Sequence, residues 1–309
     1  MAEKKESAVE IPVVDFGKFL HGSEEERKAC ATELVNAYKQ YGFAYIVNHG
    51  VSKELRESMR EQAAKYFALP LEEKMKMDWV SPESNRGYSC IGREVLDMEK
   101  SVQDIKEMFE VGKEGEDKFE NRWPPEELLP EFKAVSLQYW KACFNLHLEI
   151  LRAFALELGL PLDFFDKGCG AENNNLRMLH YPATENHTFI RAGPHTDYGT
   201  ITLLMQDDVG GLEVLGPDGE TWIPATPIED AYVVNCGDLM KRWTNDTFNS
   251  NVHRVVCYPG AHLKERYSFA YFCNPNKDTM IECLPNCGEP KYPPIKAFDH
   301  LLYKLTHTH

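Results

Sequence analysis

The sequence predicts an α+β protein whose C-terminal half is a β-sandwich or barrel. Helical patterns dominate roughly the first 160 residues, whereas short strand-like runs follow one another from Asn175 to Phe272. Turn signals separate these runs, and GPDG at Gly216–Gly219 is a strong one. Helices first and regularly spaced short strands second are typical of this class.

The N-terminal half begins with a short strand predicted at Ile11–Phe16. A helical pattern then runs to Tyr41, with Ser23 as its predicted N-cap and Glu26, three residues later, completing a capping box. Gly42 is the predicted C′ residue that ends this helix.

Phe43–Asn48 reads as a strand, and helices are predicted over Lys53–Phe67 and over Leu129–Leu158. The strand-like runs of the C-terminal half are LRMLHYP, TITLLM, GLEVL, TWIPA, AYVVN, VHRVVCY and RYSFAYF. We therefore expect residues 1–160 to form a mainly helical region whose short strands pack on the core. Residues 161–309 are expected to form the core itself, in one compact unit.

The composition is typical of a soluble globular protein, with 43% hydrophobic and 27% charged residues. No apolar run reaches the roughly 18 residues that cross a bilayer. Residues Met1–Val9 lack the apolar stretch of a signal peptide. The nine cysteines are odd in number and include no C-x-x-C pair, so we expect reduced thiols. The sequence thus predicts a cytoplasmic protein without a membrane partner.

The formal charge of −15 argues against a nucleic-acid polymer as substrate, because an acidic surface repels the phosphate backbone. A small molecule, such as a free nucleobase, a small acid or an aromatic metabolite, fits this charge. No pattern in the chain indicates an oligomeric state.

Three residues have the types and order of a metal site. His195 and Asp197 lie two apart at the apparent start of a strand, HTDYGTITLL, so both side chains are expected on one face. His253 lies in a second strand-like run. Two histidines and one carboxylate form the facial triad of non-haem iron(II) oxygenases, which leaves coordination positions open for substrate and oxygen. The alternatives are a chance H-x-D pair and a hydrogen-bonded core histidine.

Arg266 and Ser268 suggest a carboxylate site on the strand RYSFAYF. They share a face, and a guanidinium makes two parallel, charge-assisted hydrogen bonds to a carboxylate. The alternative is an arginine at the rim of the fold with a buried serine beside it.

With these five residues in this order, the chain resembles the iron(II)/2-oxoglutarate dioxygenases of the isopenicillin N synthase-like family. The resemblance covers nearly the whole chain, in the blocks IPVVDF, YGFAYIVNHGV, HYP, HTDYGTITLL, GGLEV, NCGDLMKRWTND, HRVV and RYSFAYFCNP. Within that family, SPESNRGYS, DIKEMFEVGKE, LRMLHYPA and FCNPN are most similar to fungal enzymes of the thymine dioxygenase type.

The resemblance implies a double-stranded β-helix, or jelly-roll, core with flanking helices. It implies Fe(II) at His195, Asp197 and His253, with 2-oxoglutarate as co-substrate and O2 as oxidant. The far carboxylate of 2-oxoglutarate would meet Arg266 and Ser268, and Tyr181 would also contact the co-substrate. The reaction implied is oxidation of a substrate C–H bond with release of succinate and carbon dioxide.

Strand alternation extends this reading to the main substrate. If Tyr181 points into the barrel, so does Arg177, and if Arg266 points inward, so does Phe272. We hypothesise that Arg177 meets an oxygen of the substrate, and that Phe272 and Tyr198 offer ring faces for stacking. The resemblance implies similar uses. Such a pocket suits a small, flat, oxygen-bearing ring, such as a pyrimidine or an aromatic polyketide, whose methyl group or ring C–H is oxidised. The alternatives are an ion pair of Arg177 with a structural acid such as Glu110, and a core role for Phe272.

Three rival functions remain open at this level. An oxidase of the isopenicillin N synthase or ethylene-forming type shares the triad without using 2-oxoglutarate. A zinc hydrolase can use two histidines and a carboxylate, but it gives no reason for Arg266 and Ser268. A non-catalytic jelly-roll binding protein would leave the triad unexplained.

Overall fold

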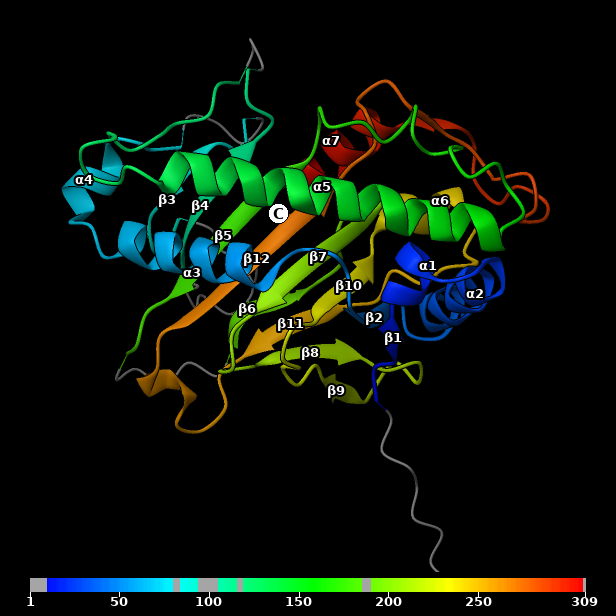
Figure 1. Cartoon of the computed structure of the whole chain (residues 1–309), viewed down its shortest axis with the longest axis horizontal. Helices are drawn as coiled ribbons and strands as arrows, with labels where there is room; N and C mark the ends of the chain where they lie inside the picture. Colours follow the sequence, from blue (N-terminus) through cyan, green and yellow to red (C-terminus); the bar gives the residue numbers. More distant parts are fainter. Residues whose placement is uncertain (1–9, 80–83, 94–104, 116–118, 185–189, 308–309) are drawn as a thin grey trace, which may run out of the picture.

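The computed structural model describes residues 10–79, 84–93, 105–115, 119–184 and 190–307. Within them two β-sheets pack face to face, and helices cover the outer face of the larger sheet (Figure 1). The predicted α+β class with a double-stranded β-helix core is confirmed. Residues 1–9, which bear on a signal peptide, and parts of the SPESNRGYS and DIKEMFEVGKE blocks lie outside the described residues.

The larger sheet combines strands from both halves of the chain, and every neighbouring pair is antiparallel except β1 with β2. In spatial order its strands are β1 (Val13–Asp15), β2 (Phe43–Val47), β10 (Tyr232–Cys236), β7 (Ile201–Gln206), β12 (Arg266–Cys273), β5 (Asn175–Tyr181), β4 (Glu107–Gly112) and β3 (Gly87–Ser89). The N-terminal half thus extends the sheet at both edges. The division of the chain near residue 160 stays a proposal.

The smaller sheet comes wholly from the C-terminal half. In spatial order its strands are β6 (Ile190–His195), β11 (His253–Val256), β8 (Leu212–Leu215) and β9 (Trp222–Pro224). A separate two-stranded ribbon joins β13 (Met280–Ile281) to β14 (Ile295–Lys296). Apolar residues of both sheets, among them Phe43, Val233, Ala192 and Val255, form an inner core between the two layers.

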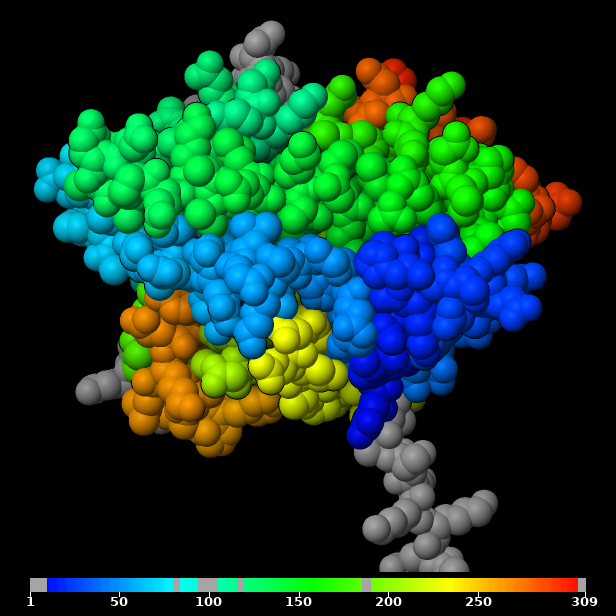
Figure 2. Space-filling model, in the orientation of Figure 1, coloured from blue at the N-terminus to red at the C-terminus, as the bar shows by residue number. Residues whose placement is uncertain are grey.

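The longest helix, α5 (Phe132–Glu157), runs across the outer face of the larger sheet, and α2 (Glu24–Gln40) and α3 (Lys53–Phe67) lie beside it (Figures 1 and 2). The remaining helices are α1 (Gly17–His21), α4 (Leu71–Met75), α6 (Asp238–Trp243), the 3₁₀ turn η1 (Ala261–Leu263) and α7 (Ala297–His307). None of the helices in the described ranges could span a lipid bilayer.

Several predicted local structures are confirmed. The Ser23 hydroxyl accepts a hydrogen bond from the Glu26 amide at 3.3 Å, and the Glu26 carboxylate accepts one from the Ser23 amide at 2.7 Å, which completes the capping box. Gly42 ends α2 with a φ of 66°, and helix α3 has the predicted bounds.

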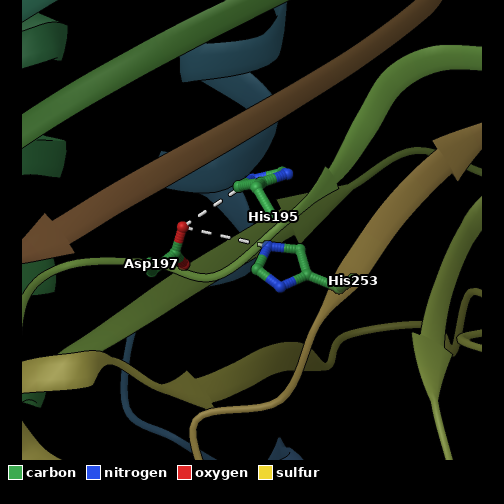
Figure 3. Close-up of side chains that lie close together, drawn as sticks. All are labelled: His195, Asp197 and His253. Carbon is green, nitrogen blue, oxygen red and sulfur yellow. Dashed lines mark ion pairs between the residues drawn. The ribbon is translucent and has the colours of Figure 1, made fainter. Parts of the chain in front are cut away.

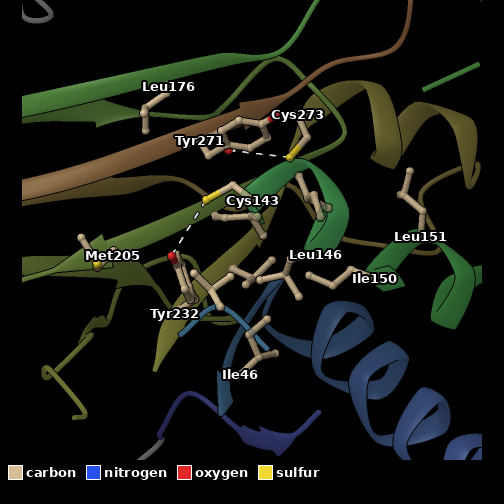
Figure 4. Close-up of a cluster of buried hydrophobic side chains, with 14 of the residues drawn as sticks. Ile46, Cys143, Leu146, Ile150, Leu151, Leu176, Met205, Tyr232, Tyr271 and Cys273 are labelled. Atoms are coloured by element: carbon tan, nitrogen blue, oxygen red, sulfur yellow. Dashed lines mark hydrogen bonds between the residues drawn. The ribbon is translucent and has the colours of Figure 1, made fainter. Parts of the chain in front are cut away.

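The outer core lies between α5 and the larger sheet. Figure 4 shows Cys143 and Leu146 of α5 against Tyr232, Tyr271 and Leu176 of the strands. Alternate residues of one strand face this core, and those between them face the space between the sheets. Both faces of the sheet are therefore covered, which explains why its strands read as nearly continuous apolar runs.

One predicted element was wrong in detail. His195 is the last residue of β6, in the smaller sheet, and Ile201 begins β7, in the larger one. Asp197 therefore lies in the crossover between two sheets, not in the strand with His195 as predicted. The chain cannot continue straight there, because it must cross from one layer to the other. The strands β3, β4, β6, β13 and β14 had no counterpart among the predicted runs.

The end of α2 gives a test of the local geometry. A Cβ added at Gly42 would lie 2.1 Å from the Asn249 carbonyl oxygen, at a left-handed φ. Gly42→Ala should therefore lower the melting temperature, through a backbone penalty of about 1–2 kcal/mol and a steric penalty of roughly 1–3 kcal/mol. The control Gly219→Ala has a φ of 72° with no atom within 4 Å, so it carries the backbone penalty alone. Equal decreases in melting temperature in the two variants would contradict the steric clash at Gly42.

Candidate functional site

A cavity lies between the two sheets, lined by residues of β5, β7, β10 and β12 on one side and β6, β8 and β11 on the other. Most of the site residues predicted from the sequence line it together. They are Arg177, Tyr181, His195, Asp197, His253, Arg266, Ser268 and Phe272.

His195 and His253 meet because their strands pair. The antiparallel register of β6 and β11 places His195 directly opposite His253, and the ring centroids are 4.3 Å apart. Asp197 reaches the same point from the crossover. Its Oδ1 lies 3.9 Å from Nε2 of His195 and 3.8 Å from Nε2 of His253 (Figure 3). The three ligand atoms all lie within 4.8 Å of one another.

Backbone carbonyls fix which nitrogen of each histidine faces the centre. Nδ1 of His195 lies 2.8 Å from the Gly193 oxygen, and Nδ1 of His253 lies 3.3 Å from the Asn251 oxygen. A carbonyl oxygen only accepts, so each Nδ1 carries the proton and donates it. Both Nε2 atoms therefore present a lone pair to the centre, which is the usual arrangement of metal-binding histidines.

The Asp197 carboxylate is held in the same way. Its Oδ2 accepts hydrogen bonds from the Thr202 hydroxyl at 2.6 Å and from the Asn235 amide at 2.8 Å. Thr202 and Asn235 lie opposite each other on β7 and β10. With Oδ2 occupied, Oδ1 is the oxygen that faces the two histidines.

The electrostatics favour the protonation states that a metal requires. Burial alone would raise the pKa of Asp197, but the two histidines and its hydrogen-bond donors outweigh burial and lower it. Burial, together with the neighbouring His253, lowers the pKa of His195 to about 4. At neutral pH the site thus offers a carboxylate and a neutral imidazole.

These residues fit a divalent ion. Ligand distances of about 2.1 Å allow one ion to join atoms up to about 4.2 Å apart, and both His–Asp separations fall below that limit. Two imidazoles and one carboxylate suit Fe(II), and three ligands leave positions open for other molecules.

Arg266 forms a second feature of the cavity wall. It is only 1% exposed, and its Nε donates to the Gly210 carbonyl at 2.7 Å while its Nη1 donates to the Ser268 hydroxyl at 3.1 Å. Its guanidinium carbon lies 4.9 Å from the centroid of the Tyr181 ring. Among the described residues no carboxylate lies within ion-pair distance of it. A buried guanidinium whose hydrogen-bond partners are neutral is suited to an anionic ligand.

Arg177 lies on the inner face of β5, as strand alternation predicts. Its Nε also donates to the Glu110 carboxylate at 2.9 Å, which is the ion pair considered as the alternative. Its guanidinium carbon lies 5.4 Å from the centroid of the Phe272 ring, so the two side chains form one wall. Their roles toward a substrate stay proposals.

Tyr198 is not among the residues that line the cavity. Its ring lies below the Lys304 ammonium, 5.8 Å from Nζ to the ring centroid, against helix α7. The sequence prediction that Tyr198 joins the pocket has no support in this arrangement.

Sequence reasoning missed three residues of the site: Lys106, Thr202 and Asn235. Lys106 is 4% exposed and lines the cavity just before β4. Asn235 did leave a signal, because an amide at the end of the apolar run AYVVN needs a hydrogen-bond partner once it is buried.

Two family models match the chain. Residues 172–275 match the 2OG-Fe(II) oxygenase superfamily, and residues 11–126 match the N-terminal part of the non-haem dioxygenases described from morphine synthesis. The match over residues 11–126 ends before α5, and the match over residues 172–275 covers the strands that carry the metal-site residues.

Relatives match over nearly the full length. The 2-oxoglutarate-Fe(II) type oxidoreductase hxnY of Emericella nidulans is 38% identical over 311 residues, covering 93% of this chain and 87% of the relative. Proline hydroxylase buaE of Petromyces alliaceus is 36% identical over 290 residues, covering 89% and 91%. The crystal structure of a full-length Neurospora crassa protein in complex with alpha-KG and thymine has a TM-score of 0.91 and 40% identity, covering 99% and 98%. The resemblance drawn from the sequence blocks is thereby confirmed.

The metal site can be tested without knowledge of a substrate. A ligand that binds only the native state raises stability by mass action, so Mn2+ should raise the melting temperature of the wild-type protein. His195→Ala removes one of the three predicted ligands and should lose most of that rise in melting temperature. His21→Ala, on the exposed end of α1, is the control and should keep it. An undiminished rise in His195→Ala would remove His195 from the ligand set.

Proposed function

Since the chain belongs to the 2OG-Fe(II) oxygenase superfamily, we propose that it hydroxylates or oxidises a C–H bond of a small, planar, oxygen-bearing metabolite. Its class and cofactors follow from the family and from its relatives: it is a 2-oxoglutarate-dependent dioxygenase that uses Fe(II) and 2-oxoglutarate. The rival oxidase, hydrolase and binding-protein functions are thereby set aside. The observation that carries the residue assignments is the convergence of the triad and the buried Arg266 on one cavity.

We assign the iron to Nε2 of His195, Nε2 of His253 and Oδ1 of Asp197. The supporting geometry is that all three atoms face one point, while the other polar atom of each side chain is held by a neighbour. Fe(II) bound there supplies oxygen activation, coupled to the conversion of 2-oxoglutarate to succinate and carbon dioxide. The protein supplies the orientation of these groups, because each ligand side chain is held by a neighbour.

We assign the distal carboxylate of 2-oxoglutarate to Arg266 and Ser268. Gly210 holds Nε of Arg266, which orients the guanidinium plane, and the Tyr181 ring supports that plane from one side. Ser268 adds a hydroxyl on the same face of β12. A planar guanidinium that is already held at Nε binds a carboxylate with little further loss of side-chain conformational entropy.

The main substrate is proposed to lie against the wall made by Arg177 and Phe272. The similar Neurospora crassa protein is described in complex with thymine, a small flat ring that bears oxygens and a methyl group. A ring of that kind could stack on Phe272 and accept a hydrogen bond from the Arg177 guanidinium. Pyrimidines and aromatic polyketides both fit this description. Tyr198 would add a second ring face only after leaving Lys304, so Phe272 carries the proposed stacking.

The co-substrate assignment predicts a specific effect of one conservative change. Arg266→Lys keeps the positive charge but loses the two parallel donors, so the KM for 2-oxoglutarate should rise at least about tenfold, the loss of roughly one charge-assisted hydrogen bond. Succinate formation at increasing 2-oxoglutarate measures this. Arg152→Lys is the control, because Arg152 pairs with Glu149 and Asp166 on the far side of the sheet. An unchanged KM in Arg266→Lys would falsify the role.

The substrate assignment is tested with thymine and a panel of methylated pyrimidines and arenes, by mass spectrometry for a gain of one oxygen. For whichever compound is turned over, Arg177→Ala should raise its KM while the Mn2+ and 2-oxoglutarate affinities stay unchanged. The expected loss of substrate-binding free energy is about 1.5–3 kcal/mol, the range for a hydrogen bond to a charged group.

Glu110→Gln is the matched variant for this test. It breaks the ion pair with Arg177 but leaves the guanidinium in the cavity wall. If Glu110→Gln and Arg177→Ala raise the substrate KM equally, Arg177 acts through its ion pair and the contact with substrate is wrong. If no planar compound gains oxygen while 2-oxoglutarate is still consumed, the substrate class is wrong and the enzyme class stands.

A further inference from the structure

The crossover that carries Asp197 rests on the first turn of helix α6. The Asp238 amide donates to the Asp197 carbonyl at 2.8 Å, and the Gly237 amide donates to the Thr200 carbonyl at 2.9 Å. The approach is close enough that a Cβ added at Gly237 would lie 2.4 Å from the Gly199 oxygen. The start of α6 and the crossover therefore form one unit.

The Asp238 side chain forms hydrogen bonds beside the ends of both strands that supply histidines. Its Oδ2 accepts a hydrogen bond from the Thr196 hydroxyl at 3.2 Å, and its Oδ1 accepts one from the Ser250 hydroxyl at 2.7 Å. Thr196 lies between His195 and Asp197, and Ser250 lies three residues before His253. One carboxylate thus touches both chain segments that carry the metal-site residues, without touching the metal-site residues' own side chains.

The charge of Asp238 is balanced by the last described helix. Nζ of Lys304, on α7, lies 2.6 Å from Oδ2 of Asp238, and the two side chains are only 23% and 14% exposed. The same ammonium lies over the ring of Tyr198, the residue after Asp197. The ammonium and the two hydroxyls together hold both oxygens of the Asp238 carboxylate in place.

We propose that Asp238 is a positioning residue of the metal centre, which holds the Thr196 and Ser250 segments at the separation that brings the three ligands together. Lys304 acts with it by fixing the carboxylate from the side of α7. This inference rests on the proposed assignment of His195, Asp197 and His253 as the metal ligands. It predicts that metal affinity depends on two residues that do not contact the metal.

The test is a titration of the full-length protein with Mn2+ in a calorimeter, which measures the Mn2+ affinity. Asp238→Ala should weaken Mn2+ binding about 10–100-fold, as the loss of residues that orient metal ligands usually does. Asp238→Asn keeps part of the hydrogen bonding, so its Mn2+ affinity should lie between those of Asp238→Ala and wild type. Lys304→Met should weaken binding less than Asp238→Ala does.

A double-mutant cycle shows whether the hydroxyl contacts carry the effect. Thr196→Val should weaken Mn2+ binding in the wild-type background, and it should have almost no additional effect in Asp238→Ala. A merely structural role for Asp238 would instead lower the melting temperature of the metal-free protein and leave Mn2+ affinity unchanged. Should Asp238→Ala fail to fold, Asp238→Asn and Lys304→Met carry the same comparison.

Asp246 provides the matched control. Its carboxylate also binds a lysine, Lys291 at 3.2 Å, and a hydroxyl, Tyr292 at 2.8 Å, but it reaches neither ligand segment. Asp246→Asn should therefore keep wild-type Mn2+ affinity. Wild-type affinity in Asp238→Ala, or equal losses in Asp238→Asn and Asp246→Asn, would overturn the positioning role.

The same titration separates this inference from the proposed function. If wild-type protein binds no Mn2+, or if His253→Ala binds it as well as wild type does, the ligand assignment itself is wrong and the positioning role falls with it. If wild type binds and His253→Ala does not, an intact affinity in Asp238→Ala rejects the positioning role alone.

Discussion

The structure depends on one register, the antiparallel pairing that sets His195 opposite His253. Because paired strands lie about 4.8 Å apart, this register brings two imidazoles together before any metal is present. The crossover to the larger sheet then adds a carboxylate from a third direction. A shift by one residue in that pairing would turn one histidine to the other face of the sheet, and the site could not form.

In the larger sheet, strand alternation places the residues that pack on the helices on one face and the residues of the candidate site on the other face. On β12, Phe269 and Tyr271 pack toward the helices, while Arg266 and Ser268 face the cavity. The long helix α5 covers the supporting face, so that the polar residues of the other face sit on a rigid base. Rigid strands keep such groups close to productive geometry better than loops do. One strand can therefore carry both a buried charge and residues of the apolar core, because the two lie on opposite faces.

Elements with strong local signals could be predicted from the sequence, as the capping box at Ser23 and the helix α3 illustrate. Alternation also placed Arg177 and Arg266 on the inner face. Strand β6 escaped prediction because it contains Gly193 and Pro194, which a strand tolerates at the edge of a sheet. The contact of Tyr198 with Lys304 joins residues more than a hundred positions apart in sequence, and local patterns carry no information about such packing.

The proposed role of the buried Arg266 would link the lifetime of the folded protein to metabolism. Its hydrogen-bond partners among the described residues are neutral, so a carboxylate that binds from solution would be the first anion to accept a hydrogen bond from it. With 2-oxoglutarate as that partner, a concentration of one hundred times Kd adds about 2.7 kcal/mol to the free energy of unfolding. A cell rich in this keto acid would then hold more of the enzyme folded and out of reach of proteases, so that the supply of the co-substrate would affect the abundance of the enzyme as well as its rate.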